Sequence, residues 1–169
     1  VQLDGGGTPS LVTPLLVLAD GGHSAADDLS LRDYGQTAIV ASVLPERVAD
    51  HTAFERFTAD GPIALLPFGD RYALIWSVRS NRAPDLISAP DAAFLGEIAR
   101  LFGRRFGNFV EVGTRAGFPL ALRFRRANAA GPRVVAIGNA AQTLHPVAGQ
   151  GLNLGLRDAA ELAEAILHA

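Results

Sequence analysis

The sequence contains no cysteine, no methionine and no lysine. Without cysteine the chain can form no disulfide, no thiolate zinc site and no cysteine nucleophile. Because lysine is absent, all 15 basic side chains are arginine, which we attribute to codon bias rather than to function. A chain that starts at Val1 and contains no methionine is expected to be either processed or part of a longer protein, and we favour the second interpretation.

Long apolar runs and an excess of charge are also missing. The longest mostly apolar stretch, residues 11–19, is about half as long as a membrane span and includes Pro14. No signal peptide is expected, because no charged segment followed by an apolar one opens the chain. The 15 basic and 17 acidic residues leave a net charge of −2, which argues against a nucleic-acid partner. The 4 histidines have no metal-ligand spacing, so we predict no metal site.

What is present predicts a folded α/β chain. Of the 169 residues 49% are apolar and 19% are charged, enough for a buried core and too apolar for disorder. The continuous apolar runs 15–19 and 133–137 are typical of strands that are buried on both faces of a parallel sheet. Residues 71–78 and 120–125 instead alternate apolar and other side chains, as in antiparallel strands. Further strands are expected at residues 37–43 and 63–66.

Two helices are predicted, and a third is indicated more weakly. The spacing from Ser88 to Asp91 resembles a capping box, and the apolar stripe that follows ends at Gly103. A second helix is expected from Gly151 to the end of the chain, and a weaker one at residues 50–57. The resulting organisation is an incomplete α/β nucleotide-binding domain of residues 1–29 and 127–169. A mostly antiparallel α+β sheet domain of residues 30–126 is inserted into it.

The segment 133–158 carries the chemistry that the sequence allows. It combines a strand, a polar Gly138-Asn139 turn and a glycine-rich entry, residues 149–151, to a long helix. Glycines at a helix start let a ligand approach the backbone, and the free N–H groups favour an anion or a polarised carbonyl. The Asn139 amide can bind a sugar hydroxyl or a phosphate. Such loops are also often only tight turns, and from spacing alone both interpretations stay open.

The same segment resembles a known flavin motif. The second flavin-binding motif of the flavoprotein aromatic hydroxylases, the group built like p-hydroxybenzoate hydroxylase, is similar to residues 138–146 (GNAAQTLHP) and 149–158 (GQGLNLGLRD). Residues 19–24, 34–41 and 54–67 also look like motifs of this group. Within the group the chain is most similar to the ubiquinone-biosynthesis branch of 2-octaprenyl-6-methoxyphenol hydroxylase.

The resemblance implies a FAD-dependent monooxygenase that uses NAD(P)H and O2 to hydroxylate a polyprenylated phenol. Asp20 and Gly21 would lie near the pyrophosphate and the nicotinamide path, and Gly138 and Asn139 would hold the ribityl–pyrophosphate region. The isoalloxazine would be lined by Pro146, Gly149, Gln150, Gly151, Leu152 and Asn153. The resemblance and the missing signal peptide together imply a cytoplasmic location, with peripheral contact to the inner face of a membrane.

Three departures from the family pattern are visible. Much of the family has Asp where this chain has Asn139, which keeps the hydrogen bonds and drops the charge. In many relatives the Asp-Gly motif ends in Arg, whereas Ser24 is here followed by AADD. No GxGxxG motif follows a first strand, so the family's ADP-binding βαβ unit is missing from these residues. We therefore expect the 169-residue chain by itself to bind FAD weakly or not at all, and to be inactive alone.

Several roles stay open at this point. Tyr72 and Trp76 face an aromatic substrate or pack in the core. We assign no catalytic residue, and we expect His145 to shape the flavin loop rather than to act as a general base. One alternative function is a flavin hydroxylase of a soluble aromatic compound. Another is a non-catalytic module for homo-oligomerisation or for assembly into a biosynthetic complex.

Overall fold

The computed structural model describes residues 12–22, 29–48, 51–125, 131–146 and 149–168. The chain divides into two compact units, unit 1 of residues 1–32 and 121–169 and unit 2 of residues 33–120. The boundaries expected from the sequence differ from these by a few residues. That unit 1 is an incomplete FAD-binding domain and unit 2 a substrate-side domain stays a prediction.

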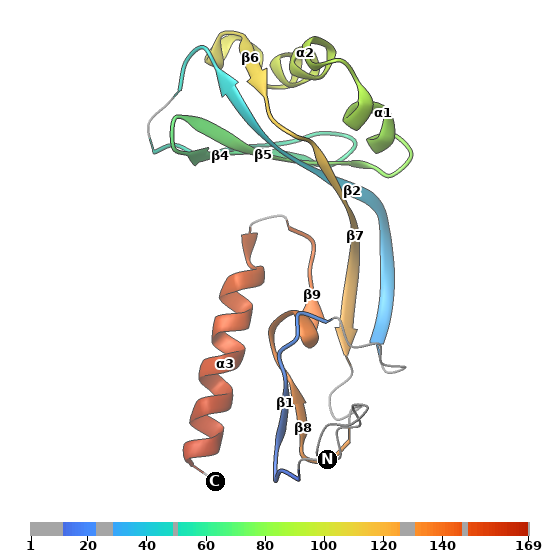
Figure 1. Ribbon diagram of the computed structural model, residues 1–169, viewed down its shortest axis with the longest axis vertical. Coiled ribbons are helices and arrows are strands. Elements are labelled where there is room, and N and C mark those ends of the chain that lie inside the picture. The colour runs from blue at the N-terminus through green and yellow to red at the C-terminus, as the bar shows by residue number, and fades with distance from the viewer. Residues whose placement is uncertain (1–11, 23–28, 49–50, 126–130, 147–148, 169) are drawn as a thin grey trace, which may run out of the picture. The chain divides into compact units, whose positions relative to one another are not determined.

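Unit 2 contains a curled antiparallel sheet, as the alternating patterns predicted. Its strands pair in the order β3 (Phe54–Phe57), β4 (Pro62–Phe68), β5 (Arg71–Arg79) and β2 (Leu29–Pro45), and β7 (Ala116–Arg125) follows β2 (Figure 1). The short strand β6 (Phe109–Val112) pairs with the last residues of β2. The pairing of β2 with β5 spans eight residue pairs, from Gln36 opposite Arg79 to Val43 opposite Tyr72.

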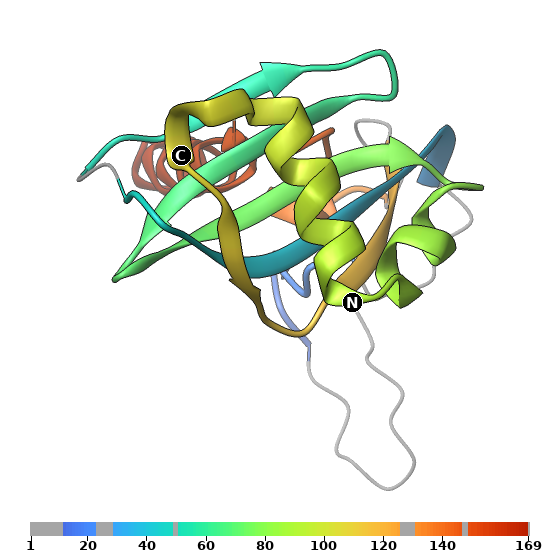
Figure 2. The same ribbon diagram turned by 90° about the horizontal axis from the view of Figure 1, so that it is seen from above.

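Helices cover one face of this sheet. The helices α1 (Ala83–Ser88) and α2 (Asp91–Phe102) lie on the same side of the strands, followed by the 3-10 turn η1 (Gly103–Phe106) (Figures 1 and 2). Alternate side chains of the central strands point toward them and are buried with Phe94 and Ile98 of α2. Burial of this apolar face supplies the main stabilisation of unit 2. The strand residues of this core are Ile39, Ala41, Val43, Ile63, Leu65, Tyr72, Leu74, Trp76 and Val78.

Two local predictions in unit 2 are wrong. The expected helix at residues 50–57 is instead strand β3 from Phe54 onward, because these residues pair with β4 in a hairpin. Residue 50 lies outside the described residues. The capping box is also absent: Ser88 ends α1, where its hydroxyl donates to the Pro84 carbonyl at 2.9 Å, and the residue before α2 is Pro90. The helix from Asp91 to Phe102, followed by Gly103, is confirmed.

Unit 1 contains a small parallel sheet and a long helix. Strands β1 (Leu16–Leu18) and β8 (Val134–Ala136) pair in parallel, as predicted. They are half-buried or exposed rather than buried on both faces as expected. The turn η2 (Gly138–Ala140) and strand β9 (Gln142–Thr143) follow, and β9 pairs with the end of β7. The helix α3 runs from Gly151 to Leu167. Among the described residues, no helix has the length and apolar character that crossing a bilayer requires.

Arg115, in the segment between β6 and β7, binds the two helices of unit 2. Its side chain is 10% exposed, and its guanidinium donates to the carbonyls of Leu86 and Ile87, both at 3.1 Å, and of Ala89 at 2.6 Å. It also pairs with the Asp91 carboxylate and lies 4.7 Å from the centre of the Phe94 ring. One side chain therefore satisfies the carbonyls at the end of α1 and anchors the first turn of α2.

We expect Arg115→Ala to lower the free energy of unfolding by about 2–4 kcal/mol, because several carbonyls lose their donor. Arg115→Lys should recover only part of this loss, since an ammonium cannot form the planar fork. Chemical denaturation of the purified variants measures both. Arg104→Ala, at an exposed position of η1, is the control and should leave stability nearly unchanged. Equal effects at both positions would contradict this role of Arg115.

Candidate functional site

Three segments that are far apart in sequence meet at the turn η2 in unit 1. Gly22 lies against it from one direction: a Cβ atom built on Gly22 would be 2.8 Å from the Asn139 carbonyl oxygen. Helix α3 lies against it from another, since a Cβ on Gly155 would be 3.5 Å from the Gly138 Cα. The structure thus brings together the segments 20–22, 138–139 and the first turns of α3.

The first of these segments is a tight turn built by its own aspartate. The Asp20 carboxylate accepts a hydrogen bond of 3.0 Å from the Gly22 amide. Gly21 and Gly22 have φ angles of 74° and 83°, which glycine adopts without strain. Arg123 of β7 donates to the Gly22 carbonyl at 2.9 Å. The turn is therefore fixed both by Asp20 and by the strand that enters unit 1.

The backbone of η2 is hydrogen-bonded on several sides. The Gly138 amide donates to the Asp158 carboxylate at 2.9 Å. The Ala141 carbonyl accepts from the Arg125 amide at 2.8 Å, and the Ala140 carbonyl accepts from the Arg125 guanidinium at 3.3 Å. Asn139 is exposed. The turn is held through its main chain, and it presents an amide residue at the surface.

The start of α3 is open. Gly149 has a φ of 59° and donates to the Pro146 carbonyl at 3.0 Å. A Cβ atom on Gly149 or on Gly151 would meet no other atom within 4 Å, and Gln150 gives the first turn no side-chain cap. Leu152 and Asn153 are exposed. An open helix start favours negative charge or a polarised carbonyl.

His145 precedes this entry and is partly buried. Burial lowers the pKa of its imidazole below the ordinary value, so the ring is neutral at neutral pH. That it shapes the loop stays a prediction. Within the described ranges, no group of three or more histidine, aspartate or glutamate side chains could hold a metal ion.

Tyr72 and Trp76 do not join this cluster. They belong to unit 2, are 0% and 1% exposed, and point toward the helical layer. The Tyr72 ring lies 5.7 Å from that of Phe106, and the Trp76 ring lies 5.9 Å from that of Phe94. Their burial favours the interpretation that Tyr72 and Trp76 pack in the core over the one in which they contact an aromatic substrate.

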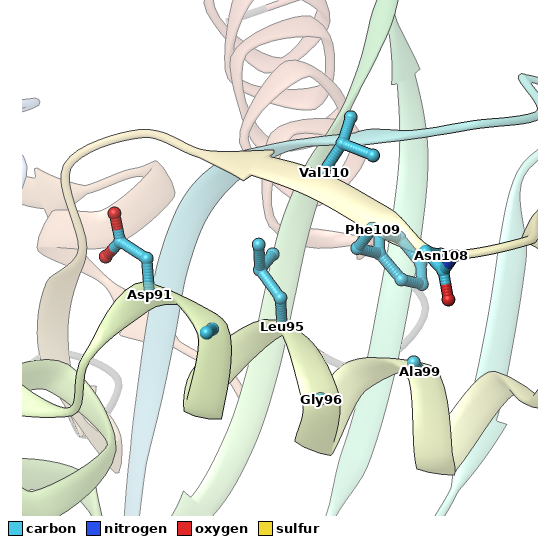
Figure 3. A pocket seen from close by; sticks show the side chains of 8 residues that line it. Asp91, Leu95, Gly96, Ala99, Asn108, Phe109 and Val110 are labelled. Carbon is cyan, nitrogen blue, oxygen red and sulfur yellow. The ribbon is translucent and has the colours of Figure 1, made fainter.

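A groove of about 380 Å³ lies in unit 2 between α2 and β6 (Figure 3). It is lined by small and apolar side chains, including Leu95, Gly96, Phe109 and Val110. Asp91 lies at its edge and is paired with Arg115. The groove therefore offers no acid–base group for a reaction.

Sequence reasoning missed the residues that hold the cluster together. Gly22, Arg123 and Asp158 make its cross-segment contacts, yet none was predicted as a site residue. Gly22 and Asp158 lie inside segments with a family resemblance, so the signal for them was present. For Arg123 there was only the alternation of β7, which does not say what the side chain contacts.

Comparison with known families identifies the family of the chain. The model of the FAD binding domain family matches residues 2–169. The chain belongs to the FAD binding domain family. The expected resemblance to FAD-dependent hydroxylases is thereby confirmed at the level of the family.

Several curated relatives carry names from ubiquinone biosynthesis. The chain is 42% identical over 161 residues to ubiquinone hydroxylase UbiL of Rhodospirillum rubrum. This alignment covers 92% of the chain and 37% of that protein. The chain is 34% identical over 161 residues to 3-demethoxyubiquinol 3-hydroxylase of Escherichia coli, covering 92% and 41%. The chain thus spans about two fifths of the length of these relatives.

Solved structures agree with the fold. PqsL of Pseudomonas aeruginosa, described as a probable FAD-dependent monooxygenase, superposes with a TM-score of 0.68 at 27% identity, over 93% of this chain and 46% of that one. PqsL has also been solved in complex with 2-aminobenzoylacetate. The flavin-dependent halogenase CmlS has a TM-score of 0.64 at 15% identity, over 88% and 30%, and shares the fold alone.

The cluster fits part of a flavin cofactor. Open backbone at Gly149 and Gly151 leaves space where a ring system could approach, and the helix start offers N–H donors. The exposed Asn139 offers an amide to a hydroxyl or a phosphate. That the ten predicted residues bind the cofactor stays a prediction.

We expect Gly22→Ala to destabilise unit 1 strongly, by about 2–4 kcal/mol, because a methyl group would overlap the Asn139 carbonyl. The positive φ by itself adds about 1 kcal/mol of strain. Gly131→Ala is the matched control, since Gly131 has a φ of 98° with nothing within 4 Å of a Cβ atom. Thermal unfolding compares the two, and equal losses would show that the close approach at Gly22 is unimportant.

Proposed function

We propose that the protein containing this chain is a FAD-dependent monooxygenase that hydroxylates a polyprenylated phenol in ubiquinone biosynthesis. The meeting of segments 20–22 and 138–139 with Gly155 and Asp158 of α3 in one unit carries the proposal. The names of the relatives support the substrate class. NAD(P)H and O2 are the proposed co-substrates.

In this proposal unit 1 holds the flavin through backbone and amide groups. The N–H groups at the start of α3 face negative charge that develops on the isoalloxazine, as in an oxyanion hole. Pro146, Gly149, Gln150, Gly151, Leu152 and Asn153 line the ring. Asn139 and Gly138 hold the ribityl–pyrophosphate region, and Asp20 and Gly21 lie beside it.

The substrate side of unit 2 is the sheet face opposite α1 and α2. Strand alternation places on that face the residues between the core positions, and the register aligns Ser42, Ala73 and Leu66 across three strands. Val40, Ala64 and Ile75 lie on the same face and are half-buried. Small and apolar side chains make this face suitable for an aromatic ring. We therefore propose this face, in place of Tyr72 and Trp76, as the one that contacts substrate.

When bound, FAD supplies the two-electron chemistry through which NAD(P)H and O2 place one oxygen atom on the ring and reduce the other to water. The residues of the chain orient the reactants and exclude water. We also propose a cytoplasmic location with peripheral membrane contact, because a polyprenylated phenol partitions into the bilayer. Homo-oligomerisation or assembly into a biosynthetic complex fits this setting.

We expect the full-length protein that contains this chain, called the full chain below, to bind FAD. Asn139→Ala should weaken this binding about tenfold, because the amide contacts are lost. The absorption spectrum of the protein, measured after FAD is added and the sample is desalted, reports retained flavin. Asn81→Ala, at an exposed position of unit 2, is the control. The 169-residue chain by itself should retain little flavin. A full chain that retains no flavin would refute the proposed function.

Ala73→Phe should raise the KM for the phenol about tenfold or more while FAD binding is unchanged, because the ring would fill the proposed substrate face. Ala93→Phe, at an exposed position of α2, is the control and should change neither. Steady-state kinetics with the full chain measure the effect. An unchanged KM for Ala73→Phe would exclude this face.

A product assay with the full chain distinguishes the proposed prenylated substrate from the alternative of a soluble aromatic substrate. Prenylated and unprenylated phenols are offered with NAD(P)H and labelled O2, and incorporation of label into each product is measured. The proposal expects a preference for the prenylated phenol. A preference for the unprenylated phenol would instead support the alternative of a soluble aromatic substrate.

A further inference from the structure

We propose that Asp158 is a positioning residue for the flavin site. Its carboxylate, on the second turn of α3, holds the Gly138 amide and thereby fixes the turn that presents Asn139. The inference rests on the proposed function, and it assigns a role to a residue outside the predicted cofactor set.

The contact is short and direct. The Gly138 amide donates to Asp158 Oδ2 at 2.9 Å, and Asp158 is half-buried. Gly138 has a φ of 57°, so its N–H does not continue the strand geometry of β8. Just before it, the Ile137 amide still donates to the Leu18 carbonyl at 3.0 Å, as in the strand ladder. Asp158 therefore supplies an acceptor for a donor at the point where the strand becomes a turn.

A glycine one turn earlier in α3 allows this contact. The helix backbone at Gly155 approaches η2 so closely that a Cβ atom there would be 3.5 Å from the Gly138 Cα. At this separation the short aspartate side chain reaches the amide. A longer side chain at position 158 would have to fold back to reach the same atom. The pair of Gly155 and Asp158 thus sets both the distance and the register between α3 and η2.

The other hydrogen bonds of η2 do not fix this relation. Arg125 binds the carbonyls of Ala140 and Ala141 from the side of β7. The hydrogen bond from the Gly138 amide to Asp158 instead joins η2 directly to α3. Because α3 begins with the proposed isoalloxazine residues and η2 carries Asn139, this bond sets their relative position.

The hydrogen bond is tested first without any cofactor. Amide exchange at Gly138, followed in the full chain without FAD, should speed up about tenfold or more in Asp158→Ala. Asp158→Asn should keep most of the protection, since its carboxamide oxygen still accepts. Glu161→Ala removes an exposed carboxylate from the next turn of the same helix, where it pairs with Arg157 at 3.7 Å, and should have no effect. Unchanged exchange in Asp158→Ala would overturn the inference.

The consequence for the site is tested with FAD. Asp158→Ala should weaken FAD binding about tenfold and shift the absorption band of the bound flavin, whereas Asp158→Asn should restore both. If Asp158→Ala does not fold, Asp158→Glu keeps the charge but displaces the carboxylate, and it should show the same loss. Normal affinity and spectrum together with fast Gly138 exchange would overturn the positioning role. Wild-type full-length protein that binds no FAD would instead refute the proposed function, whatever the exchange shows.

Discussion

The close approach of three backbone segments around η2 is the constraint on which unit 1 depends. The Asn139 carbonyl leaves no room for a side chain on Gly22, and α3 reaches the same turn at Gly155. Hydrogen bonds from Arg123 and to Asp158 then fix the segments that the glycines allow to meet. Main-chain atoms are placed more rigidly than side chains, and a site built from them needs little reorganisation to bind a charged or polarised group.

Unit 2 depends on a different constraint, the two-residue period of its strands. Alternate, mostly apolar side chains of the central strands point toward α1 and α2, and the residues between them lie on the opposite face. Tyr72 and Trp76 belong to the first set, and for this reason they are core residues. The helices cover one face of the sheet, so a substrate can reach only the opposite face. The strand pattern in the sequence does not reveal which face the helices cover.

Arginine side chains donate hydrogen bonds to backbone carbonyls in both units. Arg115 satisfies three carbonyls near the end of α1, Arg123 binds Gly22, and Arg125 binds Ala140. A guanidinium has five donors in a planar fork, so one side chain can satisfy several carbonyls at once. At these positions the fork geometry of arginine is used, whatever the reason for the absence of lysine from the chain. Arg123 and Arg125, both in β7, thereby have a structural role in unit 1.

The sequence by itself determined the elements with a strong local pattern and the segments that resemble a family. These were the parallel strands 16–18 and 134–136, the alternating strands β5 and β7, the helix from Asp91, the long final helix and the flavin motif. Residues 54–57 form strand β3 and not the expected helix, because they pair with β4 in a hairpin. Only the tertiary structure decided that Gly22, Asn139, Gly155 and Asp158 meet. The contact of Gly22 with Asn139 joins residues more than a hundred positions apart, and those of Gly155 and Asp158 with Gly138 join separate elements. No local propensity encodes either kind of contact.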